Sequence, residues 1–192
     1  MQPLLEKCKL GEKVTVGHYS CIKNAHIGKN TTIWHYCNIY GTDEHPVSIG
    51  ENCQIGSYSE IKPQVRIGNN CRMQSYVFIP EGVIIGDNVF IGPRVTFTND
   101  KYPSSIKALQ KIWTQETTII KDNTSIGAQV VIGPGITVGK CCIIGMGSVV
   151  VKDVPDYAVV HGNPAKLVGD VRDEKYANRF AELLVSKEVC SA

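Results

Sequence analysis

A six-residue periodicity constrains the fold of this chain more than any other feature of its sequence. Large apolar residues occupy every sixth position in three blocks, and most of the 18 glycines directly follow one of them. The longest block runs in unbroken register through Ile49, Ile55, Ile61, Ile67, Met73, Ile79, Ile85, Ile91 and Phe97. A second block contains Ile120, Ile126, Ile132, Val138, Ile144 and Val150, and a third contains Leu10, Val16, Ile22, Ile27, Ile33 and Ile39, with a one-residue slip before Ile27. This hexapeptide repeat predicts a solenoid of short strands.

The repeat also predicts which side chains point inward. The fourth residue after most of the large apolar positions is small, as at Ser59, Cys71 and Val77. A large and a small inward position two residues apart match the period of a strand. Asn52, Asn70 and Asn88 lie 18 residues apart, and Asn tolerates positive φ, so we expect them to stack at one corner. Three hexapeptides per turn then give a triangular prism of about seven turns, roughly 30 Å long.

Two interruptions of the repeat predict loops, and loops carry function more often than coils do. Four extra residues fall between Ile39 and Ile49, and 17 extra residues fall between Phe97 and Ile120. The second loop, residues 98–119, contains polar residues and Trp113. We expect it to project from the prism and to line a cleft or contact a partner.

The register ends after Val150, and the remaining residues favour a helix that covers the last coil. Between Asp173 and Val189, four apolar residues have helical spacing: Tyr176, Phe180, Leu183 and Leu184. Asp173 can cap this helix. The expected organisation is a β-helix domain over residues 1–155, with the loop inserted at 98–119, and a C-terminal extension over 156–192.

Composition and charge exclude several classes of protein. With 20 basic and 18 acidic residues, the net charge of +2 argues against a nucleic-acid binder. No apolar run approaches the ~20 residues of a membrane span, so we expect no membrane partner. The first 12 residues lack the apolar segment of a secretory signal, which makes the cytoplasm the expected compartment.

Five longer motifs carry a resemblance to a known family. They are, in order, Ile33-Trp34-His35-Tyr36-Cys37, Ile79-Pro80-Glu81-Gly82-Val83, Val89-Phe90-Ile91-Gly92-Pro93, Val95 through Pro103, and Gly162-Asn163-Pro164-Ala165-Lys166. The chain resembles the hexapeptide-repeat acyltransferases, and within them the N-acetyltransferases that modify the 3-amino group of UDP- or dTDP-linked amino sugars for surface polysaccharides. The resemblance implies a left-handed parallel β-helix, acetyl-coenzyme A as donor, and a homotrimer with active sites between neighbouring prisms. Members acting on 3-amino uronates often carry Gln-Asn-Asn where this chain has Gln74-Ser75-Tyr76, so the accepted sugar stays open.

Acetyl transfer from a thioester to a sugar amine requires a neutral amine, hydrogen-bond donors for the oxyanion and close positioning of both substrates. The candidates for base or orienter are His35, Asn99 and Asp100, although Asn-Asp also begins turns readily. The candidates for contact with the sugar and its nucleotide are Gln74, Tyr76, Glu81, Lys101 and Tyr102. Gln74, Tyr76 and Glu81 lie within one coil of Phe97 by the 18-residue period, so we expect them to face the same sugar.

The phosphates of coenzyme A require cations or backbone amides. The resemblance places the donor along the C-terminal coils, where the candidates are Lys140, Lys152, Lys166 and Arg172. Lys166 is the first choice among them.

The eight cysteines do not indicate a metal or a disulfide framework. Cys8, Cys37, Cys53, Cys71 and Cys142 occupy small inward positions, and no Cys-x-x-Cys pair is present. We therefore expect no metal cofactor. The alternatives are an O- or N-acetyltransferase for another small molecule, such as a serine, sugar or xenobiotic, and less favoured, a zinc carbonic anhydrase of this fold or a non-catalytic hexapeptide protein.

Overall fold

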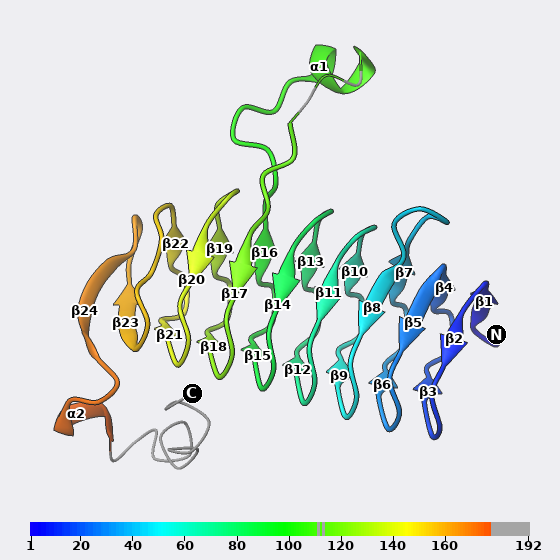
Figure 1. Cartoon of the computed structure of the whole chain (residues 1–192), viewed down its shortest axis with the longest axis horizontal. Coiled ribbons are helices and arrows are strands. Elements are labelled where there is room, and N and C mark those ends of the chain that lie inside the picture. The colour runs from blue at the N-terminus through cyan, green and yellow to red at the C-terminus, as the bar shows by residue number, and fades with distance from the viewer. Residues whose placement is uncertain (111, 113, 178–192) are drawn as a thin grey trace.

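The structure is a computed structural model that describes residues 1–110, 112 and 114–177. Its body is a triangular prism of stacked coils, with the strands running around the long axis (Figure 1). Three sheets form the three faces, and we name them A, B and C in chain order. Apart from the last two strands of sheet C, the neighbouring strands of the described residues are parallel, as in the pairs Ile67↔Ile85 and Ile85↔Ile120. The predicted parallel β-solenoid is confirmed, while its left hand stays an expectation of the resemblance.

Up to β22, each sheet takes every third strand along the chain, and sheet C then ends with β23 and β24. Sheet A contains β1 (Leu4–Glu6), β4 (Cys21–Lys23), β7 (Asn38–Tyr40), β10 (Glu60–Ile61), β13 (Phe78–Ile79), β16 (Thr96–Phe97), β19 (Val131–Ile132) and β22 (Val149–Val150). Sheet B contains β2 (Lys9–Leu10), β5 (Ala25–Ile27), β8 (Val47–Ile49), β11 (Arg66–Ile67), β14 (Ile84–Ile85), β17 (Ile119–Ile120) and β20 (Thr137–Val138). Sheet C contains β3 (Thr15–Val16), β6 (Thr32–Ile33), β9 (Gln54–Ile55), β12 (Arg72–Met73), β15 (Phe90–Ile91), β18 (Ser125–Ile126), β21 (Ile143–Ile144), β23 (Ala158–His161) and β24 (Lys166–Asp170).

The solenoid is longer than the predicted seven turns, since its sheets contain eight, seven and nine strands. The difference lies at the two ends, where the six-residue register is absent. At the N-terminal end, strand β1 precedes Leu10 and pairs with β4. At the C-terminal end, β23 pairs with β21 and so extends sheet C. Strand β24 then turns back antiparallel to β23 and covers the last edge of that sheet.

The core follows the repeat. Ile55, Ile61, Ile79 and Ile132 are fully buried, and the small inward positions Val65, Val83 and Val95 are equally inaccessible. Cys37, Cys53, Cys71 and Cys142 are buried among them, and Cys8 is half-buried, as predicted. Burial raises the pKa of the Cys142 thiol to about 11, and its Sγ donates to the Pro155 carbonyl. Cys142 therefore acts as a compact core residue rather than as a nucleophile.

The three corners of the prism differ in chemistry. The corner between sheets B and C, the asparagine corner, holds Asn30, Asn52, Asn70, Asn88 and Asn123, all at φ between 55° and 58°. Each carboxamide donates to the next along the prism, with Nδ2···Oδ1 distances of 3.0 to 3.3 Å. The predicted asparagine stack is therefore confirmed, and it is a hydrogen-bonded ladder.

The C-terminal segment begins a short helix, α2 (Glu174–Ala177), which is where the predicted helix starts. Tyr176 packs its ring against Gly169 of β24, where a Cβ would lie 2.5 Å from the ring. The rest of the predicted helix, residues 178–189, lies outside the described residues. Over the described part of the chain, no helix is long and apolar enough to cross a membrane.

Candidate functional site

The long loop leaves the prism at the corner between sheets A and B, which we name the loop corner. It runs from Thr98 to Thr118, projects far from the coils and holds helix α1 (Ser105–Gln110) at its outer end (Figure 1). None of the residues of α1 is buried, and Ile106 and Leu109 are exposed. Trp113, singled out in the sequence, lies outside the described residues.

Two contacts hold the two ends of this loop together at its base. The amide of Glu116 donates to the carbonyl of Asn99 at 3.0 Å. The side chain of Gln115 reaches back to Gln64 with an Nε2···Oε1 distance of 3.2 Å. The side chain of Gln115 also lies against Gly82, which has φ of +78°. This positive φ favours glycine at the turn.

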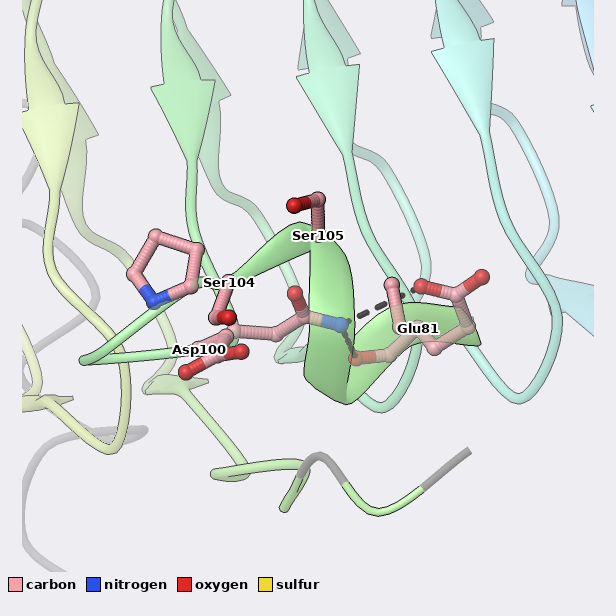
Figure 2. A pocket seen from close by; sticks show the side chains of 7 residues that line it. Glu81, Asp100, Ser104 and Ser105 are labelled. Atoms are coloured by element: carbon pink, nitrogen blue, oxygen red, sulfur yellow. Dashed lines mark hydrogen bonds between the residues drawn. The ribbon is translucent and has the colours of Figure 1, made fainter. Parts of the chain in front are cut away.

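A cavity of about 440 Å³ lies at the base of the loop, and we name it the loop-base cavity. Figure 2 shows Asp100, Ser104, Ser105 and Glu81 around it. Its lining consists of Glu81, Asn99, Asp100, Pro103, Ser104, Ser105 and Ala108. Two carboxylates, one carboxamide and two hydroxyls suit an amine and sugar hydroxyls.

Three of the predicted site residues meet in this cavity. Asn99 donates through Nδ2 to Oε2 of Glu81 at 3.1 Å and to the Glu81 carbonyl at 3.4 Å. Asp100 accepts the backbone N–H of Tyr102 through Oδ1 at 2.8 Å, so part of its carboxylate stabilises the turn, as the turn-forming alternative predicts. Its second oxygen is not used by that turn.

Four lining residues were not singled out in the sequence: Pro103, Ser104, Ser105 and Ala108. A signal for them exists, because two serines after a proline, followed by Ile106 and Leu109 at helical spacing, mark a helix start. The carbonyl of Ser104 accepts the N–H of Ala108 in the first turn of α1.

Lys101 and Tyr102 follow this cavity but are exposed on the loop. The Lys101 Nζ lies 5.7 Å from the centre of the Tyr102 ring, and Lys107 donates to the Tyr102 carbonyl. Tyr102 is 69% exposed. Both residues are thus placed near the mouth of the site without lining it.

His35, Gln74 and Tyr76 lie at a different corner, between sheets C and A. This tyrosine corner holds four stacked tyrosines, with ring centres 4.9 to 5.0 Å apart: Tyr19, Tyr36, Tyr58 and Tyr76. Each is about half exposed and has φ near +60°, which is uncommon for a bulky residue. Arg94 continues the stack, with its guanidinium 5.8 Å from the Tyr76 ring centre.

The expectation that Gln74 and Tyr76 face the same site as Glu81 does not hold within one chain. Strand β13 of sheet A lies between them, so they occupy different corners of the same coil. Tyr76 and Gly82 are six residues apart, which is at most roughly 20 Å of extended chain. Membership of one coil follows from the 18-residue period, whereas the corner depends on the hexapeptide to which each residue belongs.

His35 is held by its neighbour in the adjacent coil. Its Nδ1 accepts the backbone N–H of His18 at 2.9 Å, and the two imidazole rings stack with centres 5.6 Å apart. Trp34 lies edge-on to His35 at 6.3 Å and is exposed. Gln74 and Tyr76 lie further along the tyrosine corner. Ser75, between them, is two coils away from His35, which is roughly 10 Å at ~4.8 Å per strand.

The four predicted phosphate partners lie at the C-terminal end of the prism, in different settings. Arg172 pairs with Asp170, with Nη2···Oδ2 at 2.6 Å and Nε···Oδ1 at 2.8 Å, and it lies 4.3 Å from the Tyr157 ring centre. These hydrogen bonds from Arg172 lower the pKa of the Asp170 carboxyl. Lys140 lies 5.7 Å from the same ring centre. Lys152 is exposed after β22, and Lys166 is exposed at the start of β24.

Beside these cations lies a second hollow of about 590 Å³. It is lined by β23, β24 and the turn before them: Pro155, Asp156, Ala158, Leu167, Val168, Gly169, Asp170 and Asp173. No group of three His, Cys, Asp or Glu side chains with the geometry of a metal site occurs among the described residues.

Comparison with known protein families finds matches to two models of hexapeptide repeats. The family model for the bacterial transferase hexapeptide (six repeats) matches residues 46–81 and 117–152. The model for the hexapeptide repeat of succinyl-transferase matches residues 82–97.

Two curated relatives and one solved structure illustrate the range of substrates. The chain is 50% identical over 54 residues to dTDP-3-amino-3,6-dideoxy-alpha-D-galactopyranose 3-N-acetyltransferase of Aneurinibacillus thermoaerophilus, which is 28% of each protein. It is 33% identical over 104 residues to the galactoside O-acetyltransferase of Escherichia coli, covering 53% of this chain and 51% of that protein. A hexapeptide-repeat acetyltransferase of Vibrio cholerae, solved with acetyl-coenzyme A, is 25% identical with a TM-score of 0.50, covering 83% of this chain and 72% of that one. The chain spans about half or less of the length of these curated relatives.

Proposed function

We propose that this chain is a hexapeptide-repeat acyltransferase that transfers the acetyl group of acetyl-coenzyme A to the 3-amino group of a UDP- or dTDP-linked amino sugar. The product would serve surface-polysaccharide synthesis. The dTDP-3-amino-sugar N-acetyltransferase among the relatives supports an amine acceptor.

The observation that carries the proposal is the composition of the loop-base cavity. Asn99 and Glu81 are joined by a hydrogen bond, and Asp100 adds a second carboxylate. A carboxylate favours the ammonium form on binding and accepts a proton when the amine attacks. Asn99 orients Glu81, and Ser104 and Ser105 offer hydroxyls to the sugar.

An amine acceptor suits this cavity better than a hydroxyl. A sugar amine has a substantial neutral fraction near neutral pH, so positioning supplies much of the rate. A hydroxyl requires a strong base, most often histidine. The described lining of the cavity contains no histidine.

The separation of the two corners supports a site shared between copies. Gln74 and Tyr76 belong to the same coil as Glu81, and so they lie at the same height along the prism. In a threefold homotrimer with parallel prism axes, the loop corner of one copy faces the tyrosine corner of the next at that height. His35, Gln74 and Tyr76 of one copy then bind the substrate whose amine enters the loop-base cavity of its neighbour.

The donor is assigned to the C-terminal coils. The Vibrio cholerae structure with acetyl-coenzyme A shares the fold over most of this chain. Lys166 is the first candidate for a phosphate contact, and Lys152 and Lys140 are further candidates. Arg172 is already paired with Asp170, so a phosphate would have to displace that carboxylate.

A second candidate, acetylation of a sugar hydroxyl, is favoured by the match to galactoside O-acetyltransferase. Thiol release from acetyl-coenzyme A, measured against a panel of UDP- and dTDP-linked 3-amino sugars and their 3-hydroxy counterparts, separates the two. The proposal expects turnover with at least one amino sugar and little with its hydroxy counterpart. Turnover restricted to the hydroxy compounds would support the second candidate.

A further inference from the structure

The N-terminal end of the prism exposes part of its core. Strands β1, β2 and β3 form the first coil, and among the described residues no strand pairs with their outer edges (Figure 1). We name the surface that these three strands form the open end. Its inward side chains Leu5 and Leu10 are 43% and 40% exposed, whereas their partners in the next coil, Ile22 and Ile27, are 0% and 3% exposed. The C-terminal end differs, because β24 covers the last edge of sheet C.

The open end also presents backbone groups that can pair with another strand. The carbonyl of Ile27 accepts the N–H of Gly11 at 2.8 Å, so this large inward residue directs its carbonyl toward the preceding coil. In a strand, the N–H of the same residue points the same way. The residues that hold this place in the first coil are Leu5, Leu10 and Val16. Edge groups of this kind beside exposed apolar side chains are a template for strand pairing.

A second copy of the same end can pair with all three strands at once. A two-fold axis perpendicular to the prism reverses the strand direction, so that facing edges run antiparallel. With the axis through β3, Val16 faces Val16 of the second copy, and Leu5 of each copy faces Leu10 of the other. Two facing residues that both direct N–H and C=O across the edge form the hydrogen-bonded pair of an antiparallel ladder. One isologous contact therefore serves the three edges.

The charges at the open end favour this axis. When Leu5 faces Leu10, Glu6 of each copy lies directly opposite Lys9 of the other. Directly opposite residues outside the hydrogen-bonded pair bring their side chains closest, and opposite charges there are stabilising. Both side chains are exposed, and the ion pair of Glu6 with Lys23, at 2.9 Å, uses one of its two carboxylate oxygens.

The other two axes lack this complementarity. An axis through β1 sets Lys13 against Lys13 of the second copy, and neither it nor an axis through β2 sets an acid directly opposite a base. The axis through β3 brings Lys7 close to its own copy, but Asp43 neutralises each Lys7 at 2.7 Å. Only the axis through β3 therefore gives two ion pairs across the contact.

We propose that the open end binds a second copy of this chain, which joins two prisms end to end about a two-fold axis through β3. The contact covers the exposed side chains of Leu5 and Leu10 and adds two Glu6–Lys9 ion pairs. The inference is independent of the proposed function, because none of these residues lines the loop-base cavity.

Reversal of the charges tests the contact, with the mass of the full chain measured by sedimentation equilibrium over a series of concentrations. We expect the wild type to reach at least twice the mass of Glu6→Lys and of Lys9→Glu. Each single reversal should raise the Kd of association about tenfold, because two favourable cross-strand pairs become two unfavourable ones. The double variant Glu6→Lys/Lys9→Glu restores both pairs in the opposite sense, so its mass should return to that of the wild type.

Glu51→Lys is the matched control. It breaks the exposed ion pair of Glu51 with Lys29, at 3.3 Å, just as Glu6→Lys breaks the ion pair with Lys23. Since Glu51 lies two coils away from the open end, this variant should keep the mass of the wild type.

Equal masses of the wild type and both single reversals at every concentration would overturn the proposal. A double variant that stays as dissociated as the single ones would overturn it as well. Hydrogen exchange of the wild type needs no variant to fold: the amides of Leu5, Leu10 and Val16 should become protected as the concentration rises. Fast exchange of these three amides at every concentration would contradict the pairing.

Discussion

Nδ2 of Asn99 lies 3.1 Å from Oε2 of Glu81, and this hydrogen bond joins the first turn of the long loop to the coil before it. The two residues are 18 positions apart, which is one turn of the prism. The 18-residue repeat therefore brings Asn99 next to Glu81, and the bond between them positions the Glu81 carboxylate at the loop-base cavity.

Loss of the side chain of Asn99 or of its neighbour Asp100 should impair catalysis more than folding. We expect Asn99→Ala to lower kcat/KM for the amino sugar about tenfold or more, because Glu81 loses its orienting donor. Asp100→Ala should lower it as well, with a larger effect at low pH if the carboxylate accepts the proton of the amine. Asp43→Asn, in the other loop, is the matched control, and equal kinetics for Asn99→Ala and this control would remove Asn99 from the site.

A single strand offers a test of the inward register. Ile85 of β14 is 2% exposed, whereas its neighbour Ile84 points outward and is 37% exposed. Ile85→Asp places an unpaired carboxylate in the prism and should lower the free energy of unfolding by more than about 4 kcal/mol. Ile84→Asp should cost less than about 1 kcal/mol. Similar urea midpoints for the two variants would contradict the register.

The tyrosine stack should contribute measurable stability despite its exposure. Tyr58 has a parallel ring on both sides at 4.9 Å. Tyr58→Ala keeps the Cβ, and therefore the backbone strain at positive φ, while it removes two ring contacts worth about 0.5–1.5 kcal/mol each. We expect a loss of about 1–3 kcal/mol in denaturant unfolding, against no loss for Tyr102→Ala. Equal stability of these two variants would show that the stack contributes nothing.

Lys166 is expected to contact a phosphate of the donor. Lys166→Ala should raise KM for acetyl-coenzyme A about tenfold, as loss of a charged hydrogen bond implies, and should spare KM for the dephospho donor. Lys13→Ala at the opposite end of the prism is the control. An equal rise in KM for both donors would assign Lys166 a structural role.

The sequence predicted the architecture well because one rule repeats along it. The six-residue spacing of Ile55, Ile61 and Ile67 predicts the spacing of the strands. The 18-residue spacing of Asn52, Asn70 and Asn88 predicts the length of one turn of the prism. The ends were missed because Leu5 and Val160 lie outside the six-residue register, so the turns that they begin and end could not be counted. Coil membership of Gln74 and Glu81 was evident, but their separation by strand β13 depends on the phase of each hexapeptide.

The contacts of the site were less accessible to prediction than the fold. That Asn99 and Asp100 begin a long loop projecting from the prism followed from the interruption of the repeat. Their partners did not follow, because the loop's return and the lining by Ser104 and Ser105 depend on tertiary packing against Gln64 and Gly82. The hydrogen bond that holds the His35 ring likewise comes from a backbone amide 17 residues away.

The most direct test of the account is the position of the acetyl group in the product. The full chain is incubated with acetyl-coenzyme A and nucleotide-linked 3-amino sugars, and the product is analysed by mass spectrometry and NMR. The account predicts one added acetyl group as an amide at N3 of a UDP- or dTDP-linked sugar, with formation lowered in Asn99→Ala. Transfer to a hydroxyl, with no acetylated nitrogen on any 3-amino nucleotide sugar, would contradict it.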